Sequence, residues 1–84
     1  MDSNGVRYFQ HFKGGLYKLL LIAKDSETQE PVVVYQAMYE NSQIWIRAVK
    51  SFFSQVNING KEVPRFRELT KDEFICLQQK IEHI

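Results

Sequence analysis

Trp45 and Arg47 are the two residues of this 84-residue chain whose types and spacing best suit the recognition of a ligand. On an extended strand, residues two positions apart project from the same face. An indole ring offers stacking and cation–π attraction, and a guanidinium offers a forked donor for a carboxylate or a phosphate. Tyr35 lies on the preceding predicted strand, and Arg65, on a predicted hairpin, could reach the same rim. These residue types predict a binding face centred on Trp45 and Arg47.

The opposing interpretation is that the aromatic residues fill a small core. Four of them fall on predicted strands: Tyr17, Tyr35, Tyr39 and Trp45. Tyrosine and tryptophan often bury their rings while one polar atom finds a partner. The exposure of Trp45 separates the two interpretations, because an exposed Trp45 beside Arg47 favours binding and a sealed one favours a core position.

His11 and Lys13 are further binding candidates if the fold brings them near Arg47. His11 also opens an alternative of another class, an enzyme or accessory subunit in which its imidazole acts as an acid or a base. That function requires a carboxylate beside His11 in a pocket, and Glu62 and Glu68 are the candidates. The sequence alone assigns no catalytic residue, and the interpretation leans toward a protein that is not an enzyme.

Metal and phosphate-loop chemistry lack their usual spacings. His11, Cys76 and His83 are not paired as CxxC or HxxxH, so we expect neither a metal nor another cofactor. The Gly14-Gly15 pair has neither GxxxxGK nor GxGxxG around it, and a turn between strands explains it better.

The composition indicates one small, nearly neutral domain. Hydrophobic residues make up 44% and charged residues 25%, which is ordinary for a globular chain. The net charge is only +1, whereas proteins that bind phosphate backbones usually show a basic excess. We therefore favour a peptide, a protein or a small anionic ligand as the partner. Single-stranded RNA or a modified nucleotide, bound by stacking, is the alternative.

The sequence favours a cytoplasmic location. The single cysteine, Cys76, cannot close an intramolecular disulfide, and the N-terminus has no apolar signal-peptide region. The longest aliphatic run, Leu19–Ala23, is far shorter than the roughly 20 apolar residues that cross a bilayer. We expect no contact with a membrane.

Alternating apolar residues and turn sequences predict a series of short antiparallel strands. The predicted strands are 7–12, 16–24, 32–39, 43–49, 56–58 and 61–65. Residues 50–55 are expected to form a short helical turn or a bulged link. Asn59-Gly60 predicts a type I′ hairpin turn, because both positions of that turn need a positive φ.

The C-terminal segment changes to a helical period. Thr70 and Glu73 form a capping-box pattern. The apolar residues that follow recur on one helical face: Phe74, Leu77, Ile81 and Ile84. A helix over about 71–83 is therefore predicted to dock on the sheet, and its apolar stripe could instead pair two copies of the chain as a homodimer.

These elements predict a mainly β protein, a β-rich α+β fold in one domain over residues 1–84 with its core in 7–69. The expected architecture is a small SH3-like antiparallel barrel or curled sheet with one C-terminal helix. An open sheet backed by the helix is the alternative.

Four blocks of the chain carry a family resemblance: 9–17 (FQHFKGGLY), 33–39 (VVYQAMY), 45–52 (WIRAVKSF) and 60–66 (GKEVPRF). They resemble the patterns Y-x-H-Y/F-K-G-x-x-Y, V-V-Y-x-A-L-Y-G, W-x-R-P-x-x-x-F and G-K-x-V-P-R-F of a bacterial family, domain of unknown function 1653. The resemblance spans residues 7–69 and implies a small single-domain protein, with no established activity to transfer. Phe9, Glu40 and Ala48 depart from these patterns, whereas the candidate residues are all kept.

The sequence thus predicts a small, non-enzymatic β-rich binding module. Its candidate ligand-binding residues are Trp45, Arg47, Tyr35, His11, Lys13 and Arg65.

Overall fold

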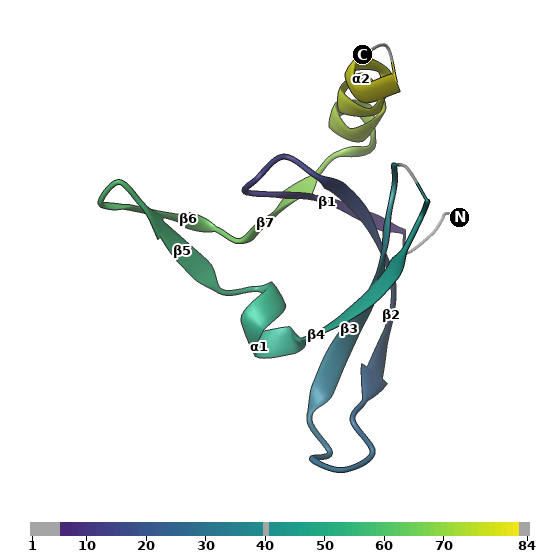
Figure 1. Ribbon diagram of the computed structural model, residues 1–84, viewed down its shortest axis with the longest axis vertical. Coiled ribbons are helices and arrows are strands. Elements are labelled where there is room, and N and C mark those ends of the chain that lie inside the picture. Colours follow the sequence, from purple (N-terminus) through teal and green to yellow (C-terminus); the bar gives the residue numbers. More distant parts are fainter. Residues whose placement is uncertain (1–5, 40, 83–84) are drawn as a thin grey trace.

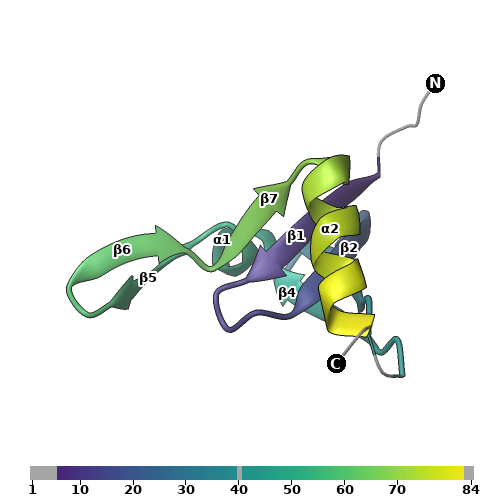
Figure 2. The same cartoon turned by 90° about the horizontal axis from the view of Figure 1, so that it is seen from above.

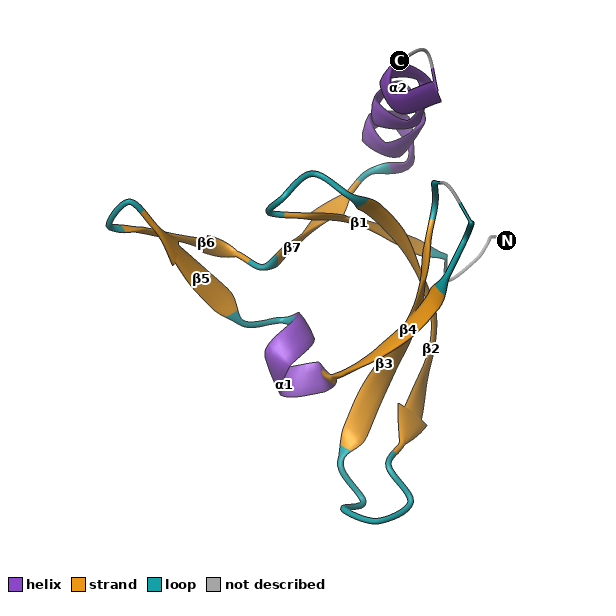
Figure 3. Cartoon of the chain, in the orientation of Figure 1, coloured by secondary structure: helices purple, strands orange, loops and turns teal. Residues whose placement is uncertain are grey.

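The computed structural model of the protein describes residues 6–39 and 41–82. Within them the chain forms β1 (Arg7–His11), β2 (Leu16–Lys24), β3 (Pro31–Ala37), β4 (Ile44–Ala48), α1 (Val49–Phe52), β5 (Gln55–Ile58), β6 (Lys61–Pro64), β7 (Phe66–Leu69) and α2 (Lys71–Glu82). Strands predominate, and the longer helix is C-terminal (Figure 3). The predicted mainly β class with one C-terminal helix is confirmed. The sequence predicted either a short helical turn or a bulged link over 50–55, and the segment after β4 is indeed helical over Val49–Phe52.

Five antiparallel strands form one curled sheet in the order β4-β3-β2-β1-β7, and β5 and β6 form a separate hairpin. Figure 1 shows the sheet curving around α1, with the β5–β6 hairpin extending to one side. A bulge between Leu19 and Leu21 shifts the β2–β3 register, and such bulges increase the bend of a strand. β4 and β7 do not pair, so the sheet is curled but not closed into a barrel. The closed-barrel form of the prediction is therefore wrong: α1 and the β5–β6 hairpin lie in the gap between β4 and β7 (Figure 1).

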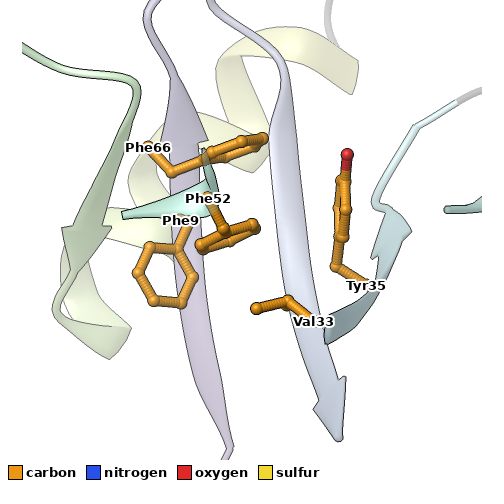
Figure 4. Packing of buried hydrophobic residues seen from close by; sticks show 5 residues of the cluster. All are labelled: Phe9, Val33, Tyr35, Phe52 and Phe66. Atoms are coloured by element: carbon orange, nitrogen blue, oxygen red, sulfur yellow. The ribbon is translucent and has the colours of Figure 1, made fainter. Parts of the chain in front are cut away.

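The inner face of the sheet holds the main core. β3 alternates regularly, with Val33 and Tyr35 buried and their neighbours half-buried, as expected for a strand with one face inward. These two side chains pack with Phe9, Phe52 and Phe66 (Figure 4). Because α1 brings Phe52 into the hollow of the curled sheet, a four-residue helix completes the core.

The outer face is covered in part by α2, which lies against β1 and β7 and passes over β1 in Figure 2. Phe74 of α2 stacks on Tyr8 with ring centroids 3.9 Å apart, and it also packs with Leu16 and Leu69. The helix begins with the predicted capping box: the N–H of Thr70 donates to Oε1 of Glu73 at 2.8 Å, and the N–H of Glu73 donates to Oγ1 of Thr70 at 3.1 Å. The predicted docking of this helix on the sheet is thus confirmed for Phe74. The Ile81 and Ile84 side chains of the stripe lie outside the described residues.

The β5–β6 hairpin has the turn that its sequence predicts. Asn59 and Gly60 have φ of 52° and 82°, the positive pair that a type I′ turn requires. β7, in contrast, was not predicted from the sequence, where strands ended at residue 65. Its burial pattern does not alternate, because Phe66 is buried on the inner face and Leu69 under α2 on the outer face, with the exposed Arg67 and Glu68 between them.

Candidate functional site

Phe66 lies at the centre of the inner face, and its ring contacts side chains from β1 to β4 and from α1. The Phe52 ring stacks on it at 4.0 Å, and three other rings approach it edge-on, those of His11, Tyr35 and Tyr17, at 4.9, 5.4 and 5.6 Å. The guanidinium carbon of Arg47 lies 5.8 Å from the ring centroid, within cation–π range. We call Phe66 together with His11, Tyr17, Tyr35 and Arg47 the Phe66 site.

Strand register explains this convergence. His11 of β1 is paired with Phe66 of β7, and Arg47 of β4 with Val33 of β3, so these side chains share the inner face. Trp45 is paired with Tyr35 and lies on the same face as Arg47, as the sequence predicted. Figure 4 shows the Tyr35 ring beside those of Phe52 and Phe66.

Trp45 is exposed, with 52% of its surface accessible, while Tyr35 is buried. The expectation that aromatic residues fill the core therefore fits Tyr35 but not Trp45. The exposure of Trp45 is the outcome that favours a binding face. The aromatic partner of Arg47 is Phe66 rather than Trp45 among the contacts of the described residues.

Two arginines flank the site and are held by serines of the α1 corner. Nη1 of Arg47 donates to Oγ of Ser51 at 3.0 Å, and Nε of Arg65 donates to Oγ of Ser54 at 3.1 Å. Nε of Arg47 is buried and has no hydrogen-bond partner among the described residues. Ser51 of α1 and Ser54, two residues after α1 ends, therefore orient the two guanidinium groups without neutralising either.

No described carboxylate pairs with these arginines. The ion pairs of the described chain are elsewhere: Arg7 with Glu68 at 2.9 Å, and Arg67 with Glu73 at 3.4 Å. Net positive charge at the inner face is thus left without a counter-charge, although the chain as a whole is nearly neutral.

The positive charge of this face affects the pKa of His11. Burial lowers the pKa of His11 below its usual value, and repulsion by Arg47, Arg65 and Lys13 lowers it further. Its Nδ1 accepts a hydrogen bond from the N–H of Lys13 at 3.1 Å, which suits the neutral imidazole. The fold thus brings His11 near Arg47 and Arg65, as a shared site requires.

The arrangement does not support the acid–base alternative for His11. Glu68 is engaged by Arg7, and no contact joins His11 to a carboxylate in the part of the chain that the structure describes. That region also lacks any group of three residues able to hold a metal ion, and none of its helices is long and apolar enough to cross a membrane.

Tyr17 and Tyr39 add a pair of phenols to the rim. Their hydroxyl oxygens lie 2.9 Å apart, and burial, followed by this hydrogen bond, raises the pKa of Tyr17. Gly15 makes room for the pair, because a Cβ there would lie 3.0 Å from Oη of Tyr39 and 3.1 Å from the Tyr17 ring. Tyr17 and Phe66 were missed as site residues, although both stand within the family blocks.

A shallow pocket of about 380 Å³ lies beside the site, and His11 is the residue that both share. Gln10, Phe12, Gly14, Val63, Pro64 and Arg67 complete its lining. Arg67, the cation of this pocket, already donates to Gln10 and to Glu73. The donors without partners lie at the Phe66 site, so we take that site as the functional candidate.

The fold and the site together define a small β-rich domain with a curled antiparallel sheet, a docked C-terminal helix and an inner face that combines aromatic rings with unpaired cations. The chain belongs to the family described as "Protein of unknown function (DUF1653)", whose model matches residues 7–68. A crystal structure of a DUF1653 protein from Bordetella bronchiseptica is similar, with a TM-score of 0.67 and 30% sequence identity, covering 74% of this chain and 82% of that chain. Among curated proteins no match is found. The family resemblance inferred from the four sequence blocks is confirmed.

Proposed function

We propose that this protein is a binding module that recognises the anionic group of a small molecule or a peptide at the Phe66 site. The proposal rests on the two arginines of this face, Arg47 and Arg65, which form no ion pair with a described carboxylate. Arg47 and Arg65 each bind one serine hydroxyl and have no carboxylate partner among the described residues, and His11 lies near both. A carboxylate or a phosphate would supply the missing counter-charge.

The buried Nε of Arg47 favours this ligand chemistry. A buried donor without an acceptor costs about 1–3 kcal/mol, and an acceptor from a ligand would recover that cost. Guanidinium groups bind carboxylates and phosphates through two parallel hydrogen bonds, so Nε and a terminal nitrogen of Arg47 would serve together.

Trp45 would contact the non-ionic part of the ligand. Its half-exposed ring lies two positions from Arg47 on the same face, where it can stack on a planar or aliphatic group. Lys13, exposed on the turn after β1, would add long-range attraction without a fixed contact.

The charge distribution favours a small anion over RNA. Arg7 and Arg67, the other arginines of the described chain, are paired with Glu68 and Glu73. These two arginines are therefore already neutralised and add no free positive charge to that of the Phe66 site, whereas backbone binding by RNA uses an extended positively charged groove. The bacterial origin and the cytoplasmic location inferred from the sequence stay predictions.

The proposal can be tested by NMR titration with inorganic phosphate, acetate and mixed-sequence single-stranded RNA at low and high salt. We expect phosphate or acetate to shift the Nε–H signal of Arg47 and the ring signals of His11. In Arg47→Gln, which lacks the Nε–H group, the anion-induced shift of the His11 ring signals should be abolished. The matched control Arg67→Gln, which removes an arginine of the outer face, should keep this shift.

Two outcomes would contradict the proposal. One is the absence of any anion-induced shift at Arg47 or His11 in the folded protein at low salt. The other is saturable, salt-sensitive RNA binding with no response to either small anion, which would move the assignment to the nucleic-acid alternative.

A further inference from the structure

β4 leaves one edge of the sheet without a strand partner. Its five residues pair with β3 on one side, no second strand of the described residues pairs with the other side, and α1 follows directly. Ile44, Trp45 and Ile46 are exposed to 52%, 52% and 67%. An exposed edge strand rich in large hydrophobic residues is a template for pairing with another chain.

The opposite edge of the same sheet is protected in the ways expected of a free edge. β7 carries the charged Arg67 and Glu68 and lies against α2. β4 has no proline, and its one charged residue, Arg47, turns to the inner face over Phe66. Because proteins commonly shield edges that remain free with proline and charge, the unshielded β4 edge indicates a partner strand.

In an antiparallel pair of strands, hydrogen-bonded and non-hydrogen-bonded residue pairs alternate, and this alternation shows which backbone groups of β4 are free to bind a further strand. The N–H of Ala37 donates to the carbonyl of Gln43 at 2.9 Å. In the observed register, the residues of β4 that exchange hydrogen bonds with β3 are therefore Trp45 and Arg47. The backbone N–H and C=O groups of Ile44, Ile46 and Ala48 consequently point away from β3, toward the free edge.

We infer that a second copy of this chain pairs antiparallel along the β4 edge, with the two-fold axis at Ile46. In this register Ile46 opposes Ile46 of the other copy, and Ile44 opposes its Ala48. These are the residues whose backbone polar groups point outward, so the Ile46–Ile46 pair and both Ile44–Ala48 pairs exchange hydrogen bonds. A two-fold interface must be self-complementary in this way.

The side chains match in the same register. On the inner face, Trp45 of each copy lies opposite Arg47 of the other, in the closely spaced non-hydrogen-bonded position. The guanidinium and the indole ring attract one another there. On the outer face the two Ile46 side chains meet, and each prolongs the aliphatic row Leu21–Val34–Ile46 that crosses β2, β3 and β4. The second copy thereby contributes a tryptophan to each arginine-bearing inner face.

The pairing is expected to be reversible. Two five-residue strands bury less than the roughly 1,200 Å² that marks stable interfaces. We therefore expect a dimer that forms at high protein concentration and dissociates on dilution.

Sedimentation equilibrium between about 1 µM and about 1 mM protein tests the inference. A reductant excludes disulfide dimers through the exposed Cys76. The wild-type protein should shift from monomer to dimer across this range. Ile46→Lys should stay monomeric because it places like charges at the axis. The control Leu21→Lys, at an outer-face position that is 52% exposed and lies away from the edge, should still dimerise.

Amide hydrogen exchange supplies a second readout that a merely unfolded variant would not imitate. Protection of the Ile46 amide should rise with protein concentration, whereas the Trp45 and Arg47 amides, bonded to β3, should be protected throughout. A wild type that is monomeric over the whole range overturns the inference. So does a dimer that Ile46→Lys leaves intact, which would assign the contact to α2 or the outer face.

Discussion

The guanidinium of Arg47 lies over the ring of Phe66, 5.8 Å from its centroid, so β4 and β7 meet through these side chains although their backbones do not pair. The contact spans the opening of the curled sheet. It joins the only charged side chain of β4 to the core, and it holds the donor on which the proposed anion recognition depends.

Phe66 is expected to contribute more to stability than any exposed ring. Phe66→Ala removes a 4%-exposed side chain that contacts four other rings, and such changes cost about 3–5 kcal/mol. Urea unfolding should show this loss. Phe53→Ala, at a ring that is 45% exposed, is the matched control. An equal loss in the two variants would contradict the central position of Phe66.

Arg47→Lys should separate charge from donor geometry. Lysine keeps the positive charge but lacks the planar fork. We expect an affinity for phosphate or acetate that is weaker by about 10- to 150-fold, because a charge-assisted hydrogen bond is worth about 1.5–3 kcal/mol. NMR titration measures the change, with Lys50→Arg as a control on the neighbouring helix. Wild-type affinity in Arg47→Lys would reduce the role of Arg47 to that of a point charge.

Gly15→Ala should disturb the tyrosine pair. The added Cβ would meet Oη of Tyr39 and the Tyr17 ring at about 3 Å, and loss of their hydrogen bond costs about 0.5–1.5 kcal/mol. The phenol titration of Tyr17, observed by ultraviolet absorbance, should move back toward its ordinary pKa. Gly14→Ala is not a suitable control because Gly14 has a φ of 108°. Tyr39→Phe is better, since it removes the same bond without added bulk.

His11 should make the protein less stable in mild acid. Its pKa in the folded state is lowered by burial and by Arg47, Arg65 and Lys13, so the unfolded chain binds more protons below the ordinary histidine pKa of about 6.5. The stability contributed by neutral His11 is complete above that pH and is lost progressively as the pH falls toward the folded-state pKa.

Urea unfolding of the wild type and His11→Gln over a pH series measures this effect. The wild type should lose more stability than the variant between about pH 7 and about pH 5. Bound phosphate should raise the pKa of His11 because the anion favours the imidazolium. If the free energy of unfolding of the two proteins depended on pH in the same way, the pKa of His11 would not be lowered by the arginines.

Thr70→Ala should weaken the docking of α2. Threonine at the helix start accepts a hydrogen bond from the N–H of Glu73, and loss of such a cap costs about 1 kcal/mol. Faster amide exchange in α2, with the sheet amides unchanged, is the expected result. Thr28→Ala, in the loop before β3, is the matched control.

The sequence by itself determined the local elements. Period-two alternation, the Asn59-Gly60 turn and the Thr70–Glu73 capping box are short-range signals, because each depends on residues a few positions apart. They predicted most strands, the hairpin and the C-terminal helix to within one or two residues. They also placed Trp45 and Arg47 on one face, since alternation along a strand depends on the backbone alone.

Only the tertiary structure decided which of these residues meet. His11 and Phe66 are 55 positions apart in the sequence and face one another because β7 returns to β1 rather than to β4. That strand order left the sheet open, gave Arg47 a phenylalanine rather than Trp45 as its ring partner, and left the edge of β4 unpaired. Strand order depends on long-range packing, which no local pattern of residues encodes.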